Sequence, residues 1–252
     1  MSRIDALATA LGRHPIFCDL DDDALKHIVE TAAEIHVERG ETLYTSGETA
    51  TQVFVILSGA IQVEYPRSGE TRGPVAAILA APSFLGEAQV IAGKPWSGTG
   101  VAITRVLALG LSKKNFVALI SRYLALTRRL YLELSHRFLG AIETWRYEPS
   151  LKPAESCARY LTCLLQVFED VEDDHDGRTI PIRQVELAQA VGVRPETVNR
   201  LLKAWQKAGL VELSNHGLAV VDREGVAALV VGPTDAPLIR VCSVPDAVEE
   251  PE

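Results

Sequence analysis

Mostly apolar side chains recur every three or four residues between positions 183 and 207, and this pattern predicts two short helices around a tight turn. The first group is Val185, Leu187, Ala188, Ala190 and Val191, and the second is Thr197, Val198, Leu201, Leu202 and Trp205. Gly192 separates the two groups, and glycine readily adopts the left-handed conformation that a sharp turn between helices needs. The stretch is therefore expected to form a helix-turn-helix.

The outward positions of the second predicted helix carry polar side chains, namely Arg194, Glu196, Asn199, Arg200 and Lys203. A short helix with polar side chains near its N-terminus, behind a glycine turn, is typical of proteins that read the major groove of DNA. The alternative is an ordinary helical hairpin whose charged face is solvated. The net charge of the chain is −8, but residues 183 to 207 carry five lysines and arginines against two glutamates. The overall acidity therefore does not exclude DNA as a partner.

Short β-rich runs fill the part of the chain between about residues 35 and 111. The clearest runs are Val53–Leu57, Ala60–Tyr65, Val75–Leu79 and Val101–Leu111, and glycine-containing turns separate them. Two short helical patterns precede them within residues 3–33, the second with Asp21 to Asp23 as N-cap residues. Many brief strands between glycine turns predict a β-sandwich or jelly roll.

A long helical pattern covers about residues 113 to 145. Its stripe steps by four and three residues, like the seam of a two-stranded coiled coil, through Thr127, Tyr131, Leu134, Phe138, Ala141 and Trp145. Leu126, Leu130 and Ile142 widen the stripe, so one flank is also expected to pack on the β-rich domain. The pattern predicts a dimerisation helix, and the alternative is a helix buried within a single chain.

Pro149 and Pro153 interrupt the helical pattern and predict a hinge. A further helix is expected over residues 154–168, followed by an acidic loop. After the helix-turn-helix, two β-rich runs flank a turn at Asn215 to Gly217 and predict a β-hairpin, which is the wing of a winged helix. The expected domains are a β-rich domain over 1–112, a dimerisation helix over 113–147, a hinge over 148–153, a winged helix-turn-helix domain over 154–231 and a mobile acidic tail over 232–252.

Several motifs in the first half of the chain resemble those of one protein family. They are Leu11 with His14-Pro15-Ile16-Phe17, Arg39-Gly40-Glu41-Thr42-Leu43, Ser46-Gly47-Glu48, Val53 to Gly59 and Phe84-Leu85-Gly86-Glu87. Followed by the helix-turn-helix, they are similar to the cyclic-AMP receptor protein / fumarate-nitrate regulator (CRP/FNR) family over residues 5–230. The resemblance implies an α+β protein with an N-terminal jelly-roll sensor domain, a dimerisation helix and a C-terminal winged helix-turn-helix. It also implies a homodimeric transcription regulator whose partners are double-stranded DNA and RNA polymerase.

The resemblance places a cyclic-nucleotide pocket in the sensor domain, and two of its contact points are altered here. Gly86-Glu87 and Ser97 match the phosphate cassette, in which glutamate binds the ribose and an arginine pairs with the cyclic phosphate. The arginine position is Trp96, which carries no charge, and a buried phosphate without a cation is costly. Ala141-Ile142 stands where nucleotide binders present a Thr-Ser pair to the base. The sequence therefore predicts no standard cyclic-AMP binding, and it leaves open an unidentified small effector, a thiol switch or no ligand.

The recognition helix also departs from one branch of the family. The pattern Arg-Glu-Thr-x-x-x-Arg appears with Pro195 in place of the first arginine, which is closer to the fumarate-nitrate regulator branch and its TTGA-like half-site. The expected base-reading residues are Glu196, Asn199 and Arg200, because arginine can bond guanine and glutamate can accept from the cytosine amino group. The expected phosphate contacts, which position the protein without specifying sequence, are Arg183, Gln184, Arg194, Thr197 and Lys203.

The composition excludes several other classes of protein. Hydrophobic residues make up 47% of the chain and charged residues 23%, which is typical of a globular protein with ample core material. The sequence shows neither a signal pattern nor an apolar run of membrane-spanning length, so the cytoplasm is the expected location. The four cysteines form no C-x-x-C pair, so we expect buried, inert thiols and no metal site. No catalytic motif indicates an enzyme, and the remaining alternative is a ligand- or redox-sensing protein-interaction module with a CRP-like fold.

Overall fold

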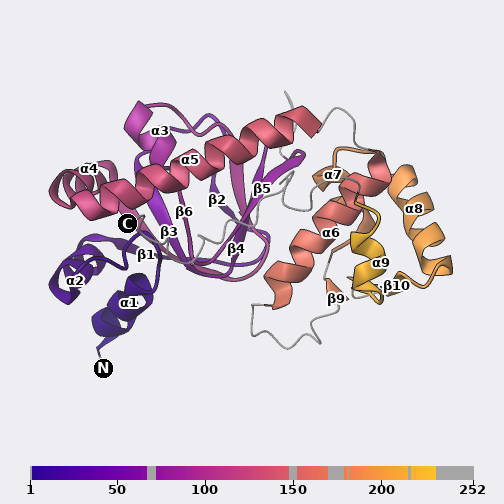
Figure 1. The fold of residues 1–252 in the computed structure, drawn as a ribbon, viewed down its shortest axis with the longest axis horizontal. Helices are drawn as coiled ribbons and strands as arrows, with labels where there is room; N and C mark the ends of the chain where they lie inside the picture. Colours follow the sequence, from indigo (N-terminus) through magenta and orange to yellow (C-terminus); the bar gives the residue numbers. More distant parts are fainter. Residues whose placement is uncertain are drawn as a thin grey trace, which may run out of the picture. The chain divides into compact units, whose positions relative to one another are not determined.

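The computed structural model describes residues 2–66, 72–147, 152–169, 179–180, 182–214 and 217–230, with the side chains of 143–147, 169 and 179 left aside. Contacts divide the chain into two compact units (Figure 1). The first contains Met1–Gln62 and Leu79–Leu139, and the second contains Val63–Ile78 and Gly140–Val241. The predicted acidic loop, most of the hinge, the Asn215-His216 turn and the tail lie outside the described residues.

The two N-terminal helices that the sequence predicts are present in the first unit, and they pack against each other. α1 (Arg3–Gly12) begins after Ser2, whose hydroxyl accepts a hydrogen bond from the Asp5 amide, and α2 (Asp22–Thr31) begins after Asp21, whose carboxylate caps Ala24. These N-caps satisfy backbone donors that lack a partner in the first helical turn. Leu11 and Ile28 are fully buried at the contact between the helices.

The strands form two four-stranded antiparallel sheets, which agrees with the predicted jelly-roll class. One sheet has the order β1-β8-β3-β6 and the other β2-β7-β4-β5. The strands are β1 (Ala33–Val37), β2 (Thr42–Tyr44), β3 (Gln52–Ser58), β4 (Ala60–Glu64), β5 (Val75–Ala80), β6 (Ser83–Leu85), β7 (Thr99–Ala102) and β8 (Val106–Ser112). Gly59 turns the chain from β3 to β4 with φ of +81°, and a Cβ atom there would lie 2.0 Å from the Arg105 carbonyl oxygen.

The run Val101–Leu111 does not form one strand. β7 and β8 lie in different sheets, because the chain turns between them at Ile103 to Arg105. The Thr104 hydroxyl accepts a hydrogen bond of 2.9 Å from the Ala60 amide, and the Ile103 amide donates to the Ala60 carbonyl. These contacts depend on a residue more than forty positions away, so alternating hydrophobicity does not reveal the turn.

The stretch predicted as one dimerisation helix contains two helices, α4 (Lys113–Arg122) and α5 (Leu124–Tyr147). Tyr123 separates them in an extended conformation, with φ of −112° and ψ of 98°. Its amide donates to the Leu119 carbonyl, as in a helix. Neither proline nor glycine stands at the break. Of the three residues expected on the flank that packs, Leu126 and Leu130 are buried, whereas Ile142 is exposed.

The second unit contains the winged helix-turn-helix. Its elements are α6 (Pro153–Glu169), β9 (Thr179–Ile180), α7 (Gln184–Ala190), α8 (Pro195–Lys207), β10 (Val211–Ser214), β11 (Gly217–Val220) and α9 (Arg223–Ala227). The predicted hairpin is present, and β9 adds a third strand in the order β10-β11-β9. Leu161, Leu187 and Leu202 are buried in its core. Within the described part of the chain, every helix is too short or too polar to cross a membrane.

Candidate functional site

α7 and α8 form the predicted helix-turn-helix, and the turn between them depends on Gly192. This residue has φ of +68°, and the next amide, that of Val193, donates to the Ala188 carbonyl over 3.0 Å. α8 then begins with Pro195, whose fixed φ and missing amide hydrogen suit the first helical position. Val198 and Leu202 are buried, which turns the opposite side of α8 outward.

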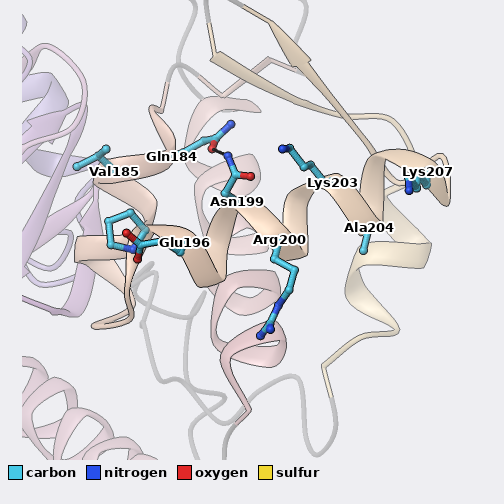
Figure 2. Close-up of a pocket in the computed structure, with 9 residues that line it drawn as sticks. Gln184, Val185, Glu196, Asn199, Arg200, Lys203, Ala204 and Lys207 are labelled. Carbon is cyan, nitrogen blue, oxygen red and sulfur yellow. Dashed lines mark hydrogen bonds between the residues drawn. The ribbon is translucent and has the colours of Figure 1, made fainter.

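The outward side of α8 and the N-terminus of α7 line an open groove of about 810 Å³ (Figure 2). Its lining residues are Gln184, Val185, Pro195, Glu196, Asn199, Arg200, Lys203, Ala204 and Lys207. All three predicted base readers therefore lie in one groove, together with Gln184 and Lys203. The sequence pattern assigned Val185 to the apolar, inward face of the first helix, but 62% of this residue is exposed.

A hydrogen bond joins the two helices at the groove. The Asn199 side-chain amide donates to Gln184 Oε1 over 2.8 Å, and both residues are half-buried. Glu196, Arg200 and Lys203 are exposed instead. Among the predicted base readers, Asn199 is thus held by another groove residue.

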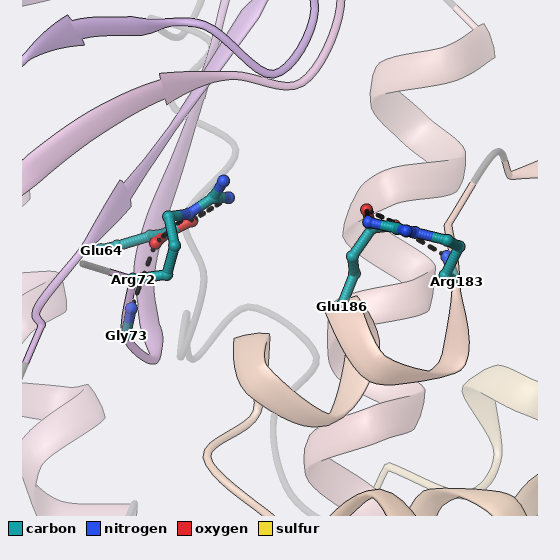
Figure 3. A network of polar contacts seen from close by, with 5 residues as sticks. All are labelled: Glu64, Arg72, Gly73, Arg183 and Glu186. Carbon is teal, nitrogen blue, oxygen red and sulfur yellow. Dashed lines mark hydrogen bonds and ion pairs between the residues drawn. The ribbon is translucent and has the colours of Figure 1, made fainter. Parts of the chain in front are cut away.

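Arg183 is the residue before α7, and its side chain interacts with Glu186 in the first turn of that helix. Its guanidinium donates to Glu186 over 2.6 and 2.9 Å, and its amide donates to the same carboxylate over 2.8 Å (Figure 3). This partner raises the pKa of Arg183. The ion pair is exposed, and exposed pairs are weak enough for a phosphate to replace the glutamate. Of the other predicted phosphate contacts, Arg194 is exposed at the N-cap of α8 and Thr197 is half-buried.

Another ion pair lies at the end of the β4–β5 hairpin, in the stretch Val63–Ile78 that belongs to the second unit (Figure 3). The Glu64 carboxylate is buried and accepts from the Arg72 guanidinium over 2.5 to 2.9 Å and from the Gly73 amide over 3.2 Å. Arg72 keeps this buried charge compensated, which makes the pair structural. The sequence pattern gave no signal for it.

An aromatic stack occupies the predicted phosphate cassette in the first unit. The indole of Trp96 lies against the Tyr44 ring, and its centroid is 5.8 Å from that of Phe54. The same indole covers Gly86, since a Cβ atom added to this glycine would lie 2.5 Å from Trp96 Cη2. Ser97 is exposed beside the stack and accepts a weak hydrogen bond of 3.3 Å from Gln89. Trp96 thus fills space over the glycine of the cassette and brings no positive charge.

Glu87, the predicted ribose contact, is buried in an ion-pair network. Arg137 of α5 donates to Glu87 over 2.9 Å, to Glu133 over 2.7 Å and to the Phe84 carbonyl over 2.6 Å. Burial raises the pKa of Glu87, and the neighbouring Arg137 opposes this shift. The arginine is compensated by two carboxylates and is therefore not a spare cation for a phosphate. Ala141 and Ile142 belong to the second unit, and both are exposed.

An exposed apolar face runs along α5. Tyr131 and Phe138, seven residues apart, are 72% and 66% exposed, and Leu124, Leu139 and Ile142 are also exposed. Of the other predicted interface residues, Leu134 is half-buried, Ala141 is exposed and the Trp145 side chain lies outside the described part. Large apolar side chains on one side of a helix are typical of surfaces that bind another protein.

The described thiols do not resemble reactive cysteines. Burial raises the pKa of Cys157 and of Cys163 to about 12, whereas reactive cysteines have a lowered pKa. Cys18 is exposed, so the expectation of buried thiols is wrong for this residue; its pKa is also raised, mainly by partial burial of the thiol. Cys242 lies outside the described residues. Within those residues, no cluster of three histidine, cysteine or acidic side chains is placed to hold a metal ion.

Two known protein domains match separate parts of the chain. The cyclic nucleotide-binding domain matches residues 34–123, and the Crp-like helix-turn-helix domain matches residues 157–229. The chain is 23% identical over 217 residues to the CRP-like cAMP-activated global transcriptional regulator of Mycobacterium tuberculosis, covering 86% of this chain and 96% of the relative. It is 25% identical over 226 residues to the transcriptional activator protein FnrA of Stutzerimonas stutzeri, covering 88% of this chain and 90% of the relative.

Solved structures show the same fold. The c-di-GMP responsive global regulator CLP of Xanthomonas campestris superposes with a TM-score of 0.65 at 18% identity, over 79% of this chain and 99% of that one. The order of the two matched domains is the order that the sequence motifs predict. The chain therefore belongs to the CRP/FNR family of transcription regulators, which bind DNA and are not enzymes.

Proposed function

We propose that this chain is a cytoplasmic, homodimeric regulator that binds a palindromic operator and does not respond to cyclic AMP. The observation that carries the proposal is the outward side of α8, where Glu196, Arg200 and Lys203 are exposed in one groove. A recognition helix enters the major groove with such side chains toward the base edges. The half-site is TTGA-like, as the Pro195-containing helix suggests.

The base-reading and phosphate-binding residues have separate roles in this proposal. Arg200 donates two hydrogen bonds to guanine O6 and N7, and Glu196 accepts from a cytosine amino group. Asn199 lies in the same groove and completes the set of base readers. The phosphate contacts are Lys203, Arg194, Thr197, the Gln184 backbone amide and Arg183 after it exchanges Glu186 for DNA.

The exposed apolar face of α5 supports the homodimer. Burying Tyr131 and Phe138 against a second copy would remove apolar surface from water, at about 25 cal/mol for each Å². Two copies joined along α5 present two recognition helices, as a palindromic operator requires. The bound dimer then acts on RNA polymerase, its proposed protein partner.

The stack over Gly86 supports a sensor that does not bind cyclic AMP. Trp96 takes the arginine position of the cassette, and Glu87 is engaged by Arg137. A cyclic phosphate placed there would be desolvated without a cation, which costs several kcal/mol. The relative from M. tuberculosis is described as cAMP-activated, so the proposal implies that the two regulators respond to different inputs.

The proposal is tested by selecting binding sites from a pool of random duplexes with the purified, ligand-free protein. We expect an enriched palindrome and a complex of two chains with one duplex in native mass spectrometry, which also reports any retained small molecule. Gel shifts at increasing salt then give the number of phosphate contacts. Enrichment of no sequence, or binding of one chain to a single half-site, would contradict the proposal.

A further inference from the structure

We propose that Gln184 and Asn199 act as one unit that reads an adenine in the major groove. This inference rests on the proposed function, since it assumes that the α8 groove faces DNA. It changes the role of Gln184, whose side chain becomes a base reader in addition to the phosphate contact through its backbone amide. It also makes α7 a contributor of sequence specificity.

The starting observation is the hydrogen bond between the two side chains. Asn199 Nδ2 donates to Gln184 Oε1 over 2.8 Å, across the helix-turn-helix. The two residues are fifteen positions apart and lie on different helices, so the bond is a tertiary contact. Both side chains are half-buried, and this limits the rotamers that each can adopt.

Each side-chain amide has a donor end and an acceptor end. The bond uses the donor of Asn199 and the acceptor of Gln184, so the pair presents the Gln184 nitrogen as a donor and the Asn199 oxygen as an acceptor. Turning both amides by 180° exchanges the two roles and still leaves one donor and one acceptor. Figure 2 shows the Gln184 nitrogen and the Asn199 oxygen pointing to the side of α8 on which Lys203 lies.

Among the four bases, adenine matches this pair. Its major-groove edge carries the N7 acceptor and the N6 donor side by side, whereas guanine shows two acceptors, cytosine a donor and thymine an acceptor beside a methyl group. A phosphate offers acceptors alone, so the Asn199 oxygen would face it unfavourably. The exposed Lys203 is the better phosphate ligand in this part of the groove.

Arg200 reads a different base pair in this arrangement. Figure 2 shows its guanidinium pointing away from the Gln184–Asn199 pair, although all three residues line one groove. One half-site therefore contains two positions that are specified separately, an adenine by the amide pair and a guanine by Arg200. Arg200→Ala is accordingly the control for loss of a base contact elsewhere in the groove.

The experiment compares the wild type with Gln184→Ala, Asn199→Ala, the double variant and Arg200→Ala in the same duplex selection. We expect a fixed A·T pair in each wild-type half-site. Both single alanine variants lose this preference, and the double variant loses no more, because either change breaks the unit. Arg200→Ala keeps the A·T pair and loses a G·C pair instead. Far-UV circular dichroism confirms that each variant folds.

Binding to modified duplexes then tests the atoms involved. Replacing the selected adenine by guanine should weaken wild-type binding roughly 5- to 100-fold, and 7-deaza-adenine, which lacks N7, should weaken it by a smaller factor. The same replacements should leave Asn199→Ala binding unchanged. The inference is wrong if the A·T preference survives in Asn199→Ala, or if Gln184→Ala weakens binding equally on all sequences. Either result leaves the proposed function standing. If the wild type enriches no motif, the proposed function fails and the inference fails with it.

Discussion

The rings of Tyr44 and Trp96 are stacked, with 3.9 Å between their centroids and 22° between their planes. Tyr44 comes from β2. Trp96 lies more than fifty residues later, in the segment between the short helix α3 (Glu87–Ala92) and β7. The stack lies over Gly86, in the segment that the sequence resemblance assigns to the phosphate cassette. The sensor domain thus keeps the fold of a nucleotide-binding domain with an altered cassette.

Trp96→Ala should destabilise the protein and should not create a cyclic-AMP site. The indole is buried and touches two aromatic rings, so its loss leaves a cavity that costs roughly 3 to 5 kcal/mol. Chemical denaturation measures the loss, and calorimetric titration with cyclic AMP checks for binding. Ile91→Ala, at an exposed position of α3, is the matched control and should cost little. Micromolar binding of cyclic AMP to the wild type would refute the explanation given for Trp96.

The stability of the sensor domain should fall between pH 6.5 and about 4 because of His14. This imidazole is fully buried, and burial lowers its pKa to about 4. Below pH 6.5 the unfolded chain takes up a proton that the folded chain does not bind until near pH 4. The free energy of unfolding therefore decreases with falling pH in this window, by roughly 3 kcal/mol for the shift of one group.

Denaturation curves at several pH values measure this dependence, and His14→Gln provides the comparison. The raised pKa of Glu87 acts in the opposite direction. As the pH falls, the folded chain protonates Glu87 at a higher pH than the unfolded chain does, and this stabilises the folded state. The difference between wild type and His14→Gln isolates the histidine. Equal pH dependence in the two proteins would show that His14 is not responsible.

The sequence predicts the two helices of the helix-turn-helix well, because their signals are local. Gly192 marks the turn, Pro195 marks the start of α8, and the buried side chains follow a period of 3.6 residues. The same local signal fails for Val185. α7 has only seven residues, and its first turn extends beyond the core, so an apolar side chain with the right spacing is exposed.

The rest of the site depends on contacts between distant residues, which local patterns do not contain. The sequence shows that Trp96 stands where the cassette has an arginine. Its stack with Tyr44 and the Arg137–Glu87 ion pair, however, form only in the folded chain. The break at Tyr123 is another case, because the flanking sequence has helical periodicity on both sides. The Gln184–Asn199 bond likewise needs the helix-turn-helix to be assembled.

Phe138→Glu should convert the protein to monomers. The side chain is 66% exposed on α5, and a carboxylate there would be desolvated in the proposed dimer interface. Light scattering after gel filtration measures the mass, and DNA binding to a palindrome should weaken because the two half-sites are no longer held by one particle. Lys114→Glu, a charge change on the exposed side of α4, should leave the dimer intact. A dimeric Phe138→Glu variant would place the interface elsewhere.

Arg200→Ala and Lys203→Ala should affect DNA binding in different ways. Loss of the Arg200 guanidinium should cost roughly 1 to 3 kcal/mol at one base pair and relax the preference there. Loss of the Lys203 ammonium should weaken binding to all sequences equally. It should also lower the slope of log affinity against log salt concentration by about one. Affinities for the selected site and for single-base variants, measured at three salt concentrations, distinguish the two effects. The assignment of Arg200 is wrong if its variant keeps the full sequence preference.

The most direct test of the account is a fluorescence anisotropy titration of the selected palindrome with wild-type protein, in the presence and absence of saturating cyclic AMP. We predict salt-dependent binding of one dimer to each palindrome, much tighter than binding to a scrambled duplex, and the same curve with and without the nucleotide. Equal affinity for both duplexes would contradict the proposed recognition by α8. Binding to the palindrome that appears only when cyclic AMP is added would contradict the proposed role of Trp96.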